Sequence, residues 1–220
     1  MIQVQEQQTK MKISYAIPVC NEHVELEKLL SFLAKHIDEN DEIVIQCDKG
    51  NTIPEVYKVL NSGILTKVRT QVKIIEFPLN GHFSNFKNNL KEHCTGHWIF
   101  QIDADELPHE LLITNLKSLL ELNPTTEMFL VPRVNTVSGL TQEHINQWRW
   151  NVNEKGWVNW PDYQTRIIQN SPKIKWQNKV HEQIVGISTK GALPMEEEWC
   201  LYHPKTIGRQ EIQNNFYDSL

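Results

Sequence analysis

The 220-residue sequence predicts an α/β protein with a mostly parallel central sheet flanked by helices. Two observations predict this class. Short apolar segments alternate with longer segments whose apolar residues recur at helical spacing, which is typical of βαβ units. Polar residues follow several of the apolar segments directly, as expected where loops gather at the carboxyl ends of parallel strands.

The first half of the chain supplies the alternating elements. Apolar runs predict four strands, over 12–19, 42–48, 72–77 and 97–103. Helices are predicted over about 26–37, 54–60, 83–93 and 111–122. Right-handed connections would place the strands in one sheet, with Asn21, Glu22, Asp48, Asp103 and Asp105 at the same edge.

The second half changes character after the apolar segment 128–134. No further strand–helix alternation follows, and five of the seven tryptophans lie within 148–176. We therefore expect one domain over 1–220, in which an irregular Trp-rich region is added to the sheet. A closing helix is expected over 208–220.

Composition argues against several classes of protein. A net charge of −5 at pH 7 and a pI near 6.0 give no electrostatic signature of nucleic-acid or anionic-membrane binding. The apolar runs are far shorter than the roughly 20 residues that span a bilayer, and 1–12 lacks the apolar core of a signal peptide. Four scattered cysteines form no CxxC pair and predict free, buried thiols in a reducing cytoplasm.

The segment WIFQIDADELPHE, residues 98–110, places four acids after a predicted buried strand. Asp103 and Asp105 are two residues apart, so an extended backbone would point both carboxylates to one side. Converging carboxylates suit Mg²⁺ or Mn²⁺, whose remaining ligands are often water and phosphate. The alternative is a solvated acidic loop that begins a helix, and Glu106 and Glu110 suit that role. We favour the metal site for the aspartates.

Several motifs occur in a specific order and spacing. These are P-x-x-N-E at 18–22, an Asp after the second strand, F-S-N-F-K-N-N-L at 83–90 and G-H-W-I-F-Q-I-D-A-D-E at 96–106. Over about 12–122 they resemble the family 2 glycosyltransferases of the GT-A fold. D-Y-Q-T-R-I at 162–167 and W-Q-N-K-V-H-E at 176–182 are similar to a branch of small bacterial transferases related to lipopolysaccharide-core glucosyltransferases. The resemblance covers most of the chain and stops near Tyr202.

The resemblance implies a metal-dependent transfer of a hexose from a nucleotide diphosphate, often UDP, to an acceptor hydroxyl with inversion. Residues 12–122 would bind the nucleotide sugar, and residues 123–220 would form the acceptor side. The implied donor-binding residues are Pro18, Asn21, Glu22, Asp48, Lys87, Asp103, Ala104 and Asp105.

Individual donor contacts follow from the resemblance. Asp48 would accept hydrogen bonds from the base, and Asn21 and Glu22 would line the nucleoside pocket, although Glu22 equally suits the start of a helix. Lys87 stands where relatives commonly carry Arg. It offers phosphate a point charge without a bidentate fork, and its alternative role is an exposed helical lysine.

The implied metal centre uses Asp105 as principal ligand, with Asp103 facing the ribose or the metal. The cation would stabilise the departing diphosphate. His181 would complete the metal shell, contact the diphosphate or be hydrogen-bonded within the substrate wall. His203 competes for the metal role.

The catalytic base is expected to be Glu182, at the H-E position of the branch. An inverting transferase needs a carboxylate near the acceptor hydroxyl to take its proton. Asp162 and Glu106 are the other candidates, and Arg166 would bind phosphate or pair with an acid. Most tryptophans of the Trp-rich region would be structural, with one or two stacking on sugar; they are Trp148, Trp150, Trp157, Trp160 and Trp176.

Other enzyme classes lack their signatures, since G-x-S-x-G, G-x-G-x-x-G and G-x-x-x-x-G-K-[ST] do not occur. A nucleotidyltransferase and a non-catalytic nucleotide- or sugar-binding module remain as alternatives. The expected partners are a nucleotide sugar and a glycan, lipid-linked or other hydroxyl acceptor. We expect a cytoplasmic protein, with peripheral membrane association and homo-oligomerisation left open.

Overall fold

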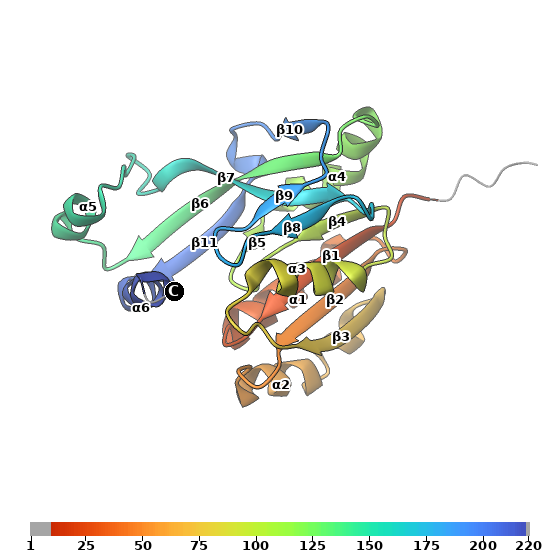
Figure 1. The fold of residues 1–220 in the computed structure, drawn as a ribbon, viewed down its shortest axis with the longest axis horizontal. Helices are drawn as coiled ribbons and strands as arrows, with labels where there is room; N and C mark the ends of the chain where they lie inside the picture. Colours follow the sequence, from red (N-terminus) through yellow and green to blue (C-terminus); the bar gives the residue numbers. More distant parts are fainter. Residues whose placement is uncertain (1–9, 219–220) are drawn as a thin grey trace, which may run out of the picture.

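The computed structural model describes residues 10–218, and nine strands in this range form one sheet (Figure 1). The strand order is β3–β2–β1–β4–β7–β6–β11–β5, with β10 beside β6. Strands β8 and β9 form a separate antiparallel pair. Residues 1–9, most of the polar N-terminal segment 1–12, and residues 219–220 of the predicted closing helix lie outside the described range.

The first half forms the parallel part of the sheet, as predicted. Its strands are β1 (Ile13–Val19), β2 (Glu42–Asp48), β3 (Gln71–Phe77) and β4 (Trp98–Gln101). Its helices are α1 (His23–His36), α2 (Pro54–Asn61), η1 (Ile64–Lys67), α3 (Phe83–Glu92) and α4 (Glu110–Leu122). Strands β1, β2 and β4 are buried along almost their whole length, so they read as continuous apolar runs.

Two layers cover this sheet and together make the core. Helices α1, α2 and α4 pack on one face, where α1 buries Leu26, Leu29 and Leu30 against β1 and β2. Helix α3 lies on the other face with the β8–β9 pair beside it (Figure 1). The carboxyl ends of β1, β2 and β4 stay uncovered by these layers, which leaves room for a site.

The second half is more regular than the sequence predicts. Its elements are β6 (Met128–Ser138), α5 (Gln142–Trp148), β7 (Val158–Gln169), β8 (Lys175–Gln177), β9 (Gln183–Val185), β10 (Lys190–Ala192), η2 (Glu197–Trp199), β11 (Leu201–Thr206) and α6 (Ile207–Asp218). The short strand β5 (Leu107–Pro108) belongs to the first half and pairs with β11. The Trp-rich region thus contains a 12-residue strand, β7, antiparallel to β4 and β6. Its first residues, VNWPD, lack simple alternation, which is why the strand escaped prediction.

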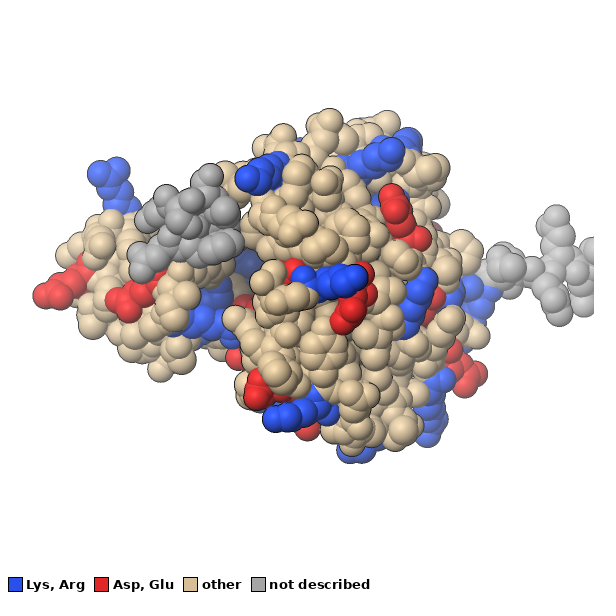
Figure 2. Space-filling model, turned by 60° about the horizontal axis from the view of Figure 1, so that its bottom comes forward, with Lys and Arg blue, Asp and Glu red and all other residues tan. Residues whose placement is uncertain are grey.

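The cysteines, the helix lengths and the surface charge of the described residues bear on the remaining expectations. All four cysteines are free, and Cys47, Cys94 and Cys200 are buried, which confirms the prediction of unpaired thiols. No helix within residues 10–218 is long and apolar enough to cross a membrane. On the face shown in Figure 2, acidic and basic side chains are interspersed rather than gathered into one large patch.

Candidate functional site

A cavity of about 240 Å³ lies at the carboxyl ends of β1 and β2 and beside the turn that follows β4. Its lining includes the predicted residues Pro18, Glu22, Asp48, Lys87, Asp103, Ala104, Asp105 and Glu182. Leu79, Phe83 and Phe86 add an apolar wall. Asn21 is exposed and is not among the lining residues. Polar groups predicted from separate segments therefore meet in one cavity.

Asp48 closes the end of β2 and is almost fully buried. One carboxylate oxygen accepts a hydrogen bond from the Leu79 amide at 2.9 Å, and the other accepts from the Asn51 side chain at 3.0 Å. Because a carboxylate can accept about four hydrogen bonds, these two contacts orient the group and leave acceptor capacity for a ligand.

Glu22 shapes the loop between β1 and α1. It stands at the N-cap position of α1, but its side chain does not cap the helix. Instead, Oε2 accepts from the amides of Cys20 at 2.8 Å and Asn21 at 2.9 Å, while Oε1 lies 3.3 Å from Nη2 of Arg209. The carboxylate holds the preceding turn in the shape that lines the cavity.

The turn after β4 differs from the extended segment that the sequence suggests. The chain leaves the ladder after Gln101 and turns, with the Asp103 carbonyl accepting from the Glu106 amide at 2.8 Å. As a result the two aspartates have different partners. Asp103 is ion-paired with Arg166, whereas Asp105 faces His203 at 3.3 Å.

Fixed charges offset the repulsion between these carboxylates. Burial raises the pKa of Asp103, but the nearby cations Arg166, Lys87 and Arg133 together hold the pKa below its usual value. Burial also raises the pKa of Asp105, but His203, Lys205 and Arg209 together hold it well below the usual range. Both carboxylates are therefore charged at neutral pH without any bound ion.

Glu106 corrects the expectation of a helix-starting acid. The N-cap of α4 is His109, and Glu106 is 1% exposed. Its Oε1 accepts from Arg133 at 3.0 Å and from Arg166 at 2.7 Å, and its Oε2 accepts from the Asp103 amide at 3.2 Å. Glu106 thus connects the turn to strands β6 and β7. Of the two roles predicted for Arg166, binding phosphate or pairing with an acid, the structure shows the pairing with an acid.

Asp162, the other alternative base, is also held by Arg133. Its Oδ2 accepts from Nε at 2.9 Å, from Nη2 at 2.6 Å and from the Asn135 amide at 2.8 Å. Asp162 and Glu106 both serve as counter-ions of buried arginines, and neither is among the residues that line the cavity. Their arrangement favours a structural role.

Glu182 reaches the cavity from the loop between β8 and β9 and is ion-paired with Lys87 of α3. The two side chains are 16% and 13% exposed, so Lys87 is not the exposed helical lysine of the alternative interpretation. Its ammonium also lies 4.4 Å from the ring centroid of Trp176, which is buried beneath it. Neighbouring His181 is exposed and is not among the lining residues.

His203 is the histidine that lies next to Asp105. Asn135 donates through its amide nitrogen to Asp162, so its carbonyl oxygen, 2.7 Å from Nδ1 of His203, accepts the Nδ1 proton. Nε2 of His203 therefore faces Oδ2 of Asp105 at 3.3 Å. A proton on Nε2 can join the two groups, and a divalent cation can take its place.

Arg209 is a site residue that sequence reasoning missed. It projects from α6 and contacts Glu25 of α1 at 2.9 Å, Glu22 at 3.3 Å and Oδ2 of Asp105 at 3.5 Å. No motif surrounds it, and only the packing of the C-terminal helix brings it to the donor half. It joins both halves of the chain at the rim of the cavity.

The donor set at Asp105 fits a cation with few protein ligands. Within residues 10–218, no group of three or more His, Cys, Asp or Glu side chains could hold a metal. Asp105 and His203 supply two ligand atoms 3.3 Å apart. Adjacent ligands of an octahedral ion at about 2.1 Å lie about 3 Å from one another, so the pair suits an ion whose other ligands are diphosphate and water.

The sheet and its cavity define a GT-A glycosyltransferase fold. Residues 14–181 match the family described as Glycosyl transferase family 2, and the chain belongs to this family. Family membership favours the glycosyltransferase interpretation over a nucleotidyltransferase. The resemblance to the branch of lipopolysaccharide-core transferases stays a prediction.

Two solved structures share the fold. S. aureus TarS is 13% identical with a TM-score of 0.59, over 93% of this chain and 38% of TarS. S. aureus TarS 1–349 in complex with UDP-GlcNAc is 14% identical with a TM-score of 0.59, over 89% of this chain and 59% of that chain. The chain therefore spans little more than a third of TarS. No match to it was found among curated proteins.

Proposed function

We propose that this protein is a metal-dependent glycosyltransferase that moves a hexose from a UDP-sugar to an acceptor hydroxyl with inversion. The observation that carries this proposal is the meeting of Asp48, Asp105 and Glu182 in one cavity. Each supplies a different requirement: a base contact, a metal ligand and a proton acceptor. The UDP-GlcNAc complex of TarS, which has the same fold, supports a uridine donor.

The nucleoside would lie between Asp48 and the apolar wall. Leu79, Phe83 and Phe86 offer a surface for a planar base, and the free acceptor capacity of Asp48 suits a ring N–H. Asp103, oriented by Arg166, would accept from the ribose hydroxyls. These contacts place the diphosphate toward Lys87 and Asp105.

Asp105 and His203 would hold the divalent cation, Mn²⁺ or Mg²⁺. When bound there, the cation would stabilise the negative charge that develops on the departing diphosphate. Asn135 contributes by keeping Nε2 of His203 directed at Asp105. Arg209 adds a fixed positive charge at the same end of the cavity.

Lys87 and Glu182 would exchange partners during the reaction. In the structure, the ammonium of Lys87 forms an ion pair with one carboxylate oxygen of Glu182. The diphosphate is a multiply charged counter-ion, so its arrival would draw Lys87 away from Glu182. The released carboxylate would take the acceptor's hydroxyl proton while that oxygen bonds to the anomeric carbon and the bond to diphosphate breaks. The donor is then expected to bind before the acceptor.

Residues 1–220 would act as one domain, with the donor half over about 12–122 and the acceptor side over about 123–220. The free thiols suit a reducing compartment such as the cytoplasm.

A donor screen tests the proposal. UDP-glucose, UDP-galactose, UDP-GlcNAc and GDP-mannose are each tested with Mn²⁺ or EDTA, by thermal shift and by donor hydrolysis. A UDP-sugar at about 100 times its Kd should stabilise the fold by about 2.7 kcal/mol, which raises Tm by roughly 5–10 °C for a chain of this size. If no nucleotide sugar raises Tm with Mn²⁺ present, the proposal fails. A Tm rise without any turnover would instead indicate a non-catalytic binding module.

Matched variants separate the roles. E182Q should keep the Mn²⁺-dependent shift and lose about 10²-fold or more in turnover. D105N should lose the metal-dependent part of the shift. E110Q, which changes a 66% exposed acid in the same segment, should keep both the Mn²⁺-dependent shift and the turnover of the wild type. Full turnover by E182Q would mean that another residue is the base.

A further inference from the structure

A second cavity, of about 210 Å³, adjoins the donor cavity at His203. His203 is part of its lining, while Asp105, which His203 contacts at 3.3 Å, lines the donor cavity. The contact between these two side chains thus separates the two cavities. Strands β6 and β11, helix α6 and the segment that follows α5 form the walls of the second cavity.

The charge of this cavity is one-sided, since no acid occurs among its described lining residues. It contains two permanent cations. The charge of Arg133 is already matched by Glu106 and Asp162. Lys205 is different: its ammonium donates to Oε1 of Gln213, and among the side chains described over residues 10–214 no carboxylate lies at ion-pair distance from it.

Lys205 is partly buried, and burial lowers the pKa of its ammonium although the carboxylate of Asp105 acts to raise it. Asp105 lies beyond ion-pair distance, so the charge of Lys205 is only partly compensated. An anionic ligand would supply the missing charge. By contrast, the groove beside Trp157 and Met195 carries the acidic run 196–198 and would repel such a ligand. Of these two hollows in the acceptor half, the one at Lys205 is therefore the one that suits an anion.

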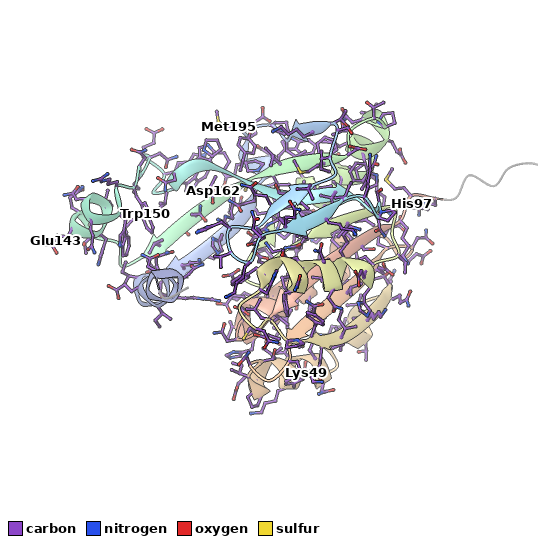
Figure 3. The ribbon with its side chains drawn as sticks, in the orientation of Figure 1. Lys49, His97, Glu143, Trp150, Asp162 and Met195 are labelled. Atoms are coloured by element: carbon purple, nitrogen blue, oxygen red, sulfur yellow. The ribbon has the colours of Figure 1, made fainter. Side chains whose placement is uncertain are left out.

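The rest of the cavity suits hydroxyl groups and a sugar-like face. Amide side chains from three segments line it, namely Asn135, Asn159, Gln210, Gln213 and Asn214. Trp150 adds an aromatic ring, held at 4.7 Å from the ring of Trp148, and it lies beside α5 in Figure 3. Amides can both donate to and accept from hydroxyls, and aromatic rings pack on the apolar face of a sugar or polyol.

We propose that this cavity is an acceptor subsite for an anionic sugar or polyol, with the anionic group on Lys205 and hydroxyls on the amides. The proposal rests on the proposed function, because it takes the donor to lie in the adjoining cavity. An acceptor anchored here would extend past His203 and Asp105 toward the end of the donor diphosphate. Phosphate and carboxylate are the two anionic groups that the cavity chemistry admits.

The test is a calorimetric titration of the full chain in the presence of Mn²⁺ and UDP. Glycerol 3-phosphate and glucuronic acid are compared with the neutral glycerol and glucose, and with inorganic phosphate. We expect at least one anionic ligand to bind about tenfold or more tightly than its neutral counterpart, because a charge-assisted hydrogen bond is gained. The stronger of the two anionic ligands identifies phosphate or carboxylate as the natural group.

Variants connect the preference to the cavity. K205Q and N214D should each abolish the preference for anionic over neutral ligands. K205R should retain this preference, and K155Q, in the acidic groove, should leave it unchanged. N214D leaves Lys205 in place and keeps an oxygen for the amide of Gln210, so it tests the charge even if K205Q folds poorly. Equal binding of charged and neutral ligands, or a preference that survives both variants, would overturn the proposal. So would inorganic phosphate binding as tightly as glycerol 3-phosphate, since the amides would then contribute nothing.

UDP titration of the same samples separates this proposal from the proposed function. Wild-type protein that binds UDP with Mn²⁺ but shows no anion preference refutes the acceptor subsite alone. Anion preference without any UDP binding refutes the donor assignment and leaves an anion site at Lys205.

Discussion

At the scale of single residues, the most constrained group is the Glu106 carboxylate. One of its oxygens accepts hydrogen bonds from Arg133 and Arg166, and the other accepts a hydrogen bond from the Asp103 amide. With Asp103 and Asp162, these residues form a partly buried network of three carboxylates and two guanidinium groups, in which Glu106 and Arg166 are the buried members. The network positions the turn that carries Asp103 and Asp105, so stability and donor binding depend on the same charges.

A substitution of Arg166 tests this network, because Asp103 and Glu106 would both lose their ion pair with its buried guanidinium. R166M should lower the free energy of unfolding by about 3–5 kcal/mol, the cost of an uncompensated buried charge. Urea unfolding at neutral pH measures the effect. The exposed Arg69 gives the control variant R69M, for which we expect a change within about 0.5 kcal/mol. A loss below about 1 kcal/mol in R166M would show that the network is not essential to stability.

Sequence reasoning identified Asp48, Asp105 and Glu182 as site candidates because each stands in a motif with recognisable spacing. It missed the hub at Glu106 and the contact of Arg209. Glu106 pairs with arginines of β6 and β7, and Arg209 of α6 pairs with acids of the first half. These partners are far apart along the chain, and local pattern carries no information on such contacts. The neighbour of Asp105 remained open between His181 and His203 for the same reason, and the structure brings His203 there.

At the scale of elements, Arg209 connects α6 to the donor half. Arg209 contacts Glu25 and Glu22 of the β1–α1 region, and it is 30% exposed. Ion pairs of this exposure contribute little to global stability. Their effect is local, because they hold the N-terminal end of α6 over the rim of the cavity.

R209Q should therefore change the free energy of unfolding by less than about 1 kcal/mol. Amide hydrogen exchange across Ile207–Asp218 should nevertheless become faster, since local opening is easier without the contact. Mass spectrometry of peptic peptides measures this exchange. I212Q, at a position that is 72% exposed on the same helix, is the matched control and should leave exchange unchanged. Equal protection in R209Q and wild type would mean that other contacts hold α6.

The elements of the first half were predictable to within a few residues. Strand β2 was predicted at its observed limits, Glu42–Asp48, because it is buried on both faces and carries a run of β-branched apolar residues, 43–45, ended by the polar turn after Asp48. Strand β7 was not predicted, since about half of it carries partly buried residues without a simple alternation of apolar and polar side chains. Asp162 and Arg166 of β7 belong to the ion-pair network around Glu106, and their charges conceal the strand pattern.

At the scale of the whole molecule, the end of the sheet opposite the cavity is held by charged groups that respond to acid. Glu42 begins β2 and is 3% exposed. Burial raises the pKa of its carboxyl, and hydrogen bonds from Lys12, Ser14 and Thr95 more than offset this and lower the pKa to about 2. The unfolded value is about 4.3. The group therefore stabilises the fold fully above pH ~4.3 and loses this contribution as pH falls toward 2.

Stability should accordingly fall between about pH 4.5 and pH 2, and Glu42 should account for part of the slope. E42Q should be less stable than wild type at pH 7 and should lose less on acidification. Urea midpoints at pH 7, 4 and 3 measure both effects. The exposed Glu121 provides the control E121Q, whose pH dependence should follow that of wild type. An unchanged slope in E42Q would assign the acid sensitivity to other carboxylates.

The metal centre at Asp105 and His203 is tested most directly by electron paramagnetic resonance of Mn²⁺ titrated into protein with UDP. Wild-type protein should retain Mn²⁺ with UDP present. H203A should weaken this retention by about tenfold or more, because one of two protein ligands is lost. H181A, at the neighbouring exposed candidate, should retain Mn²⁺ as wild type does. Retention that is unchanged in H203A, or that is lost in H181A, would contradict the assignment.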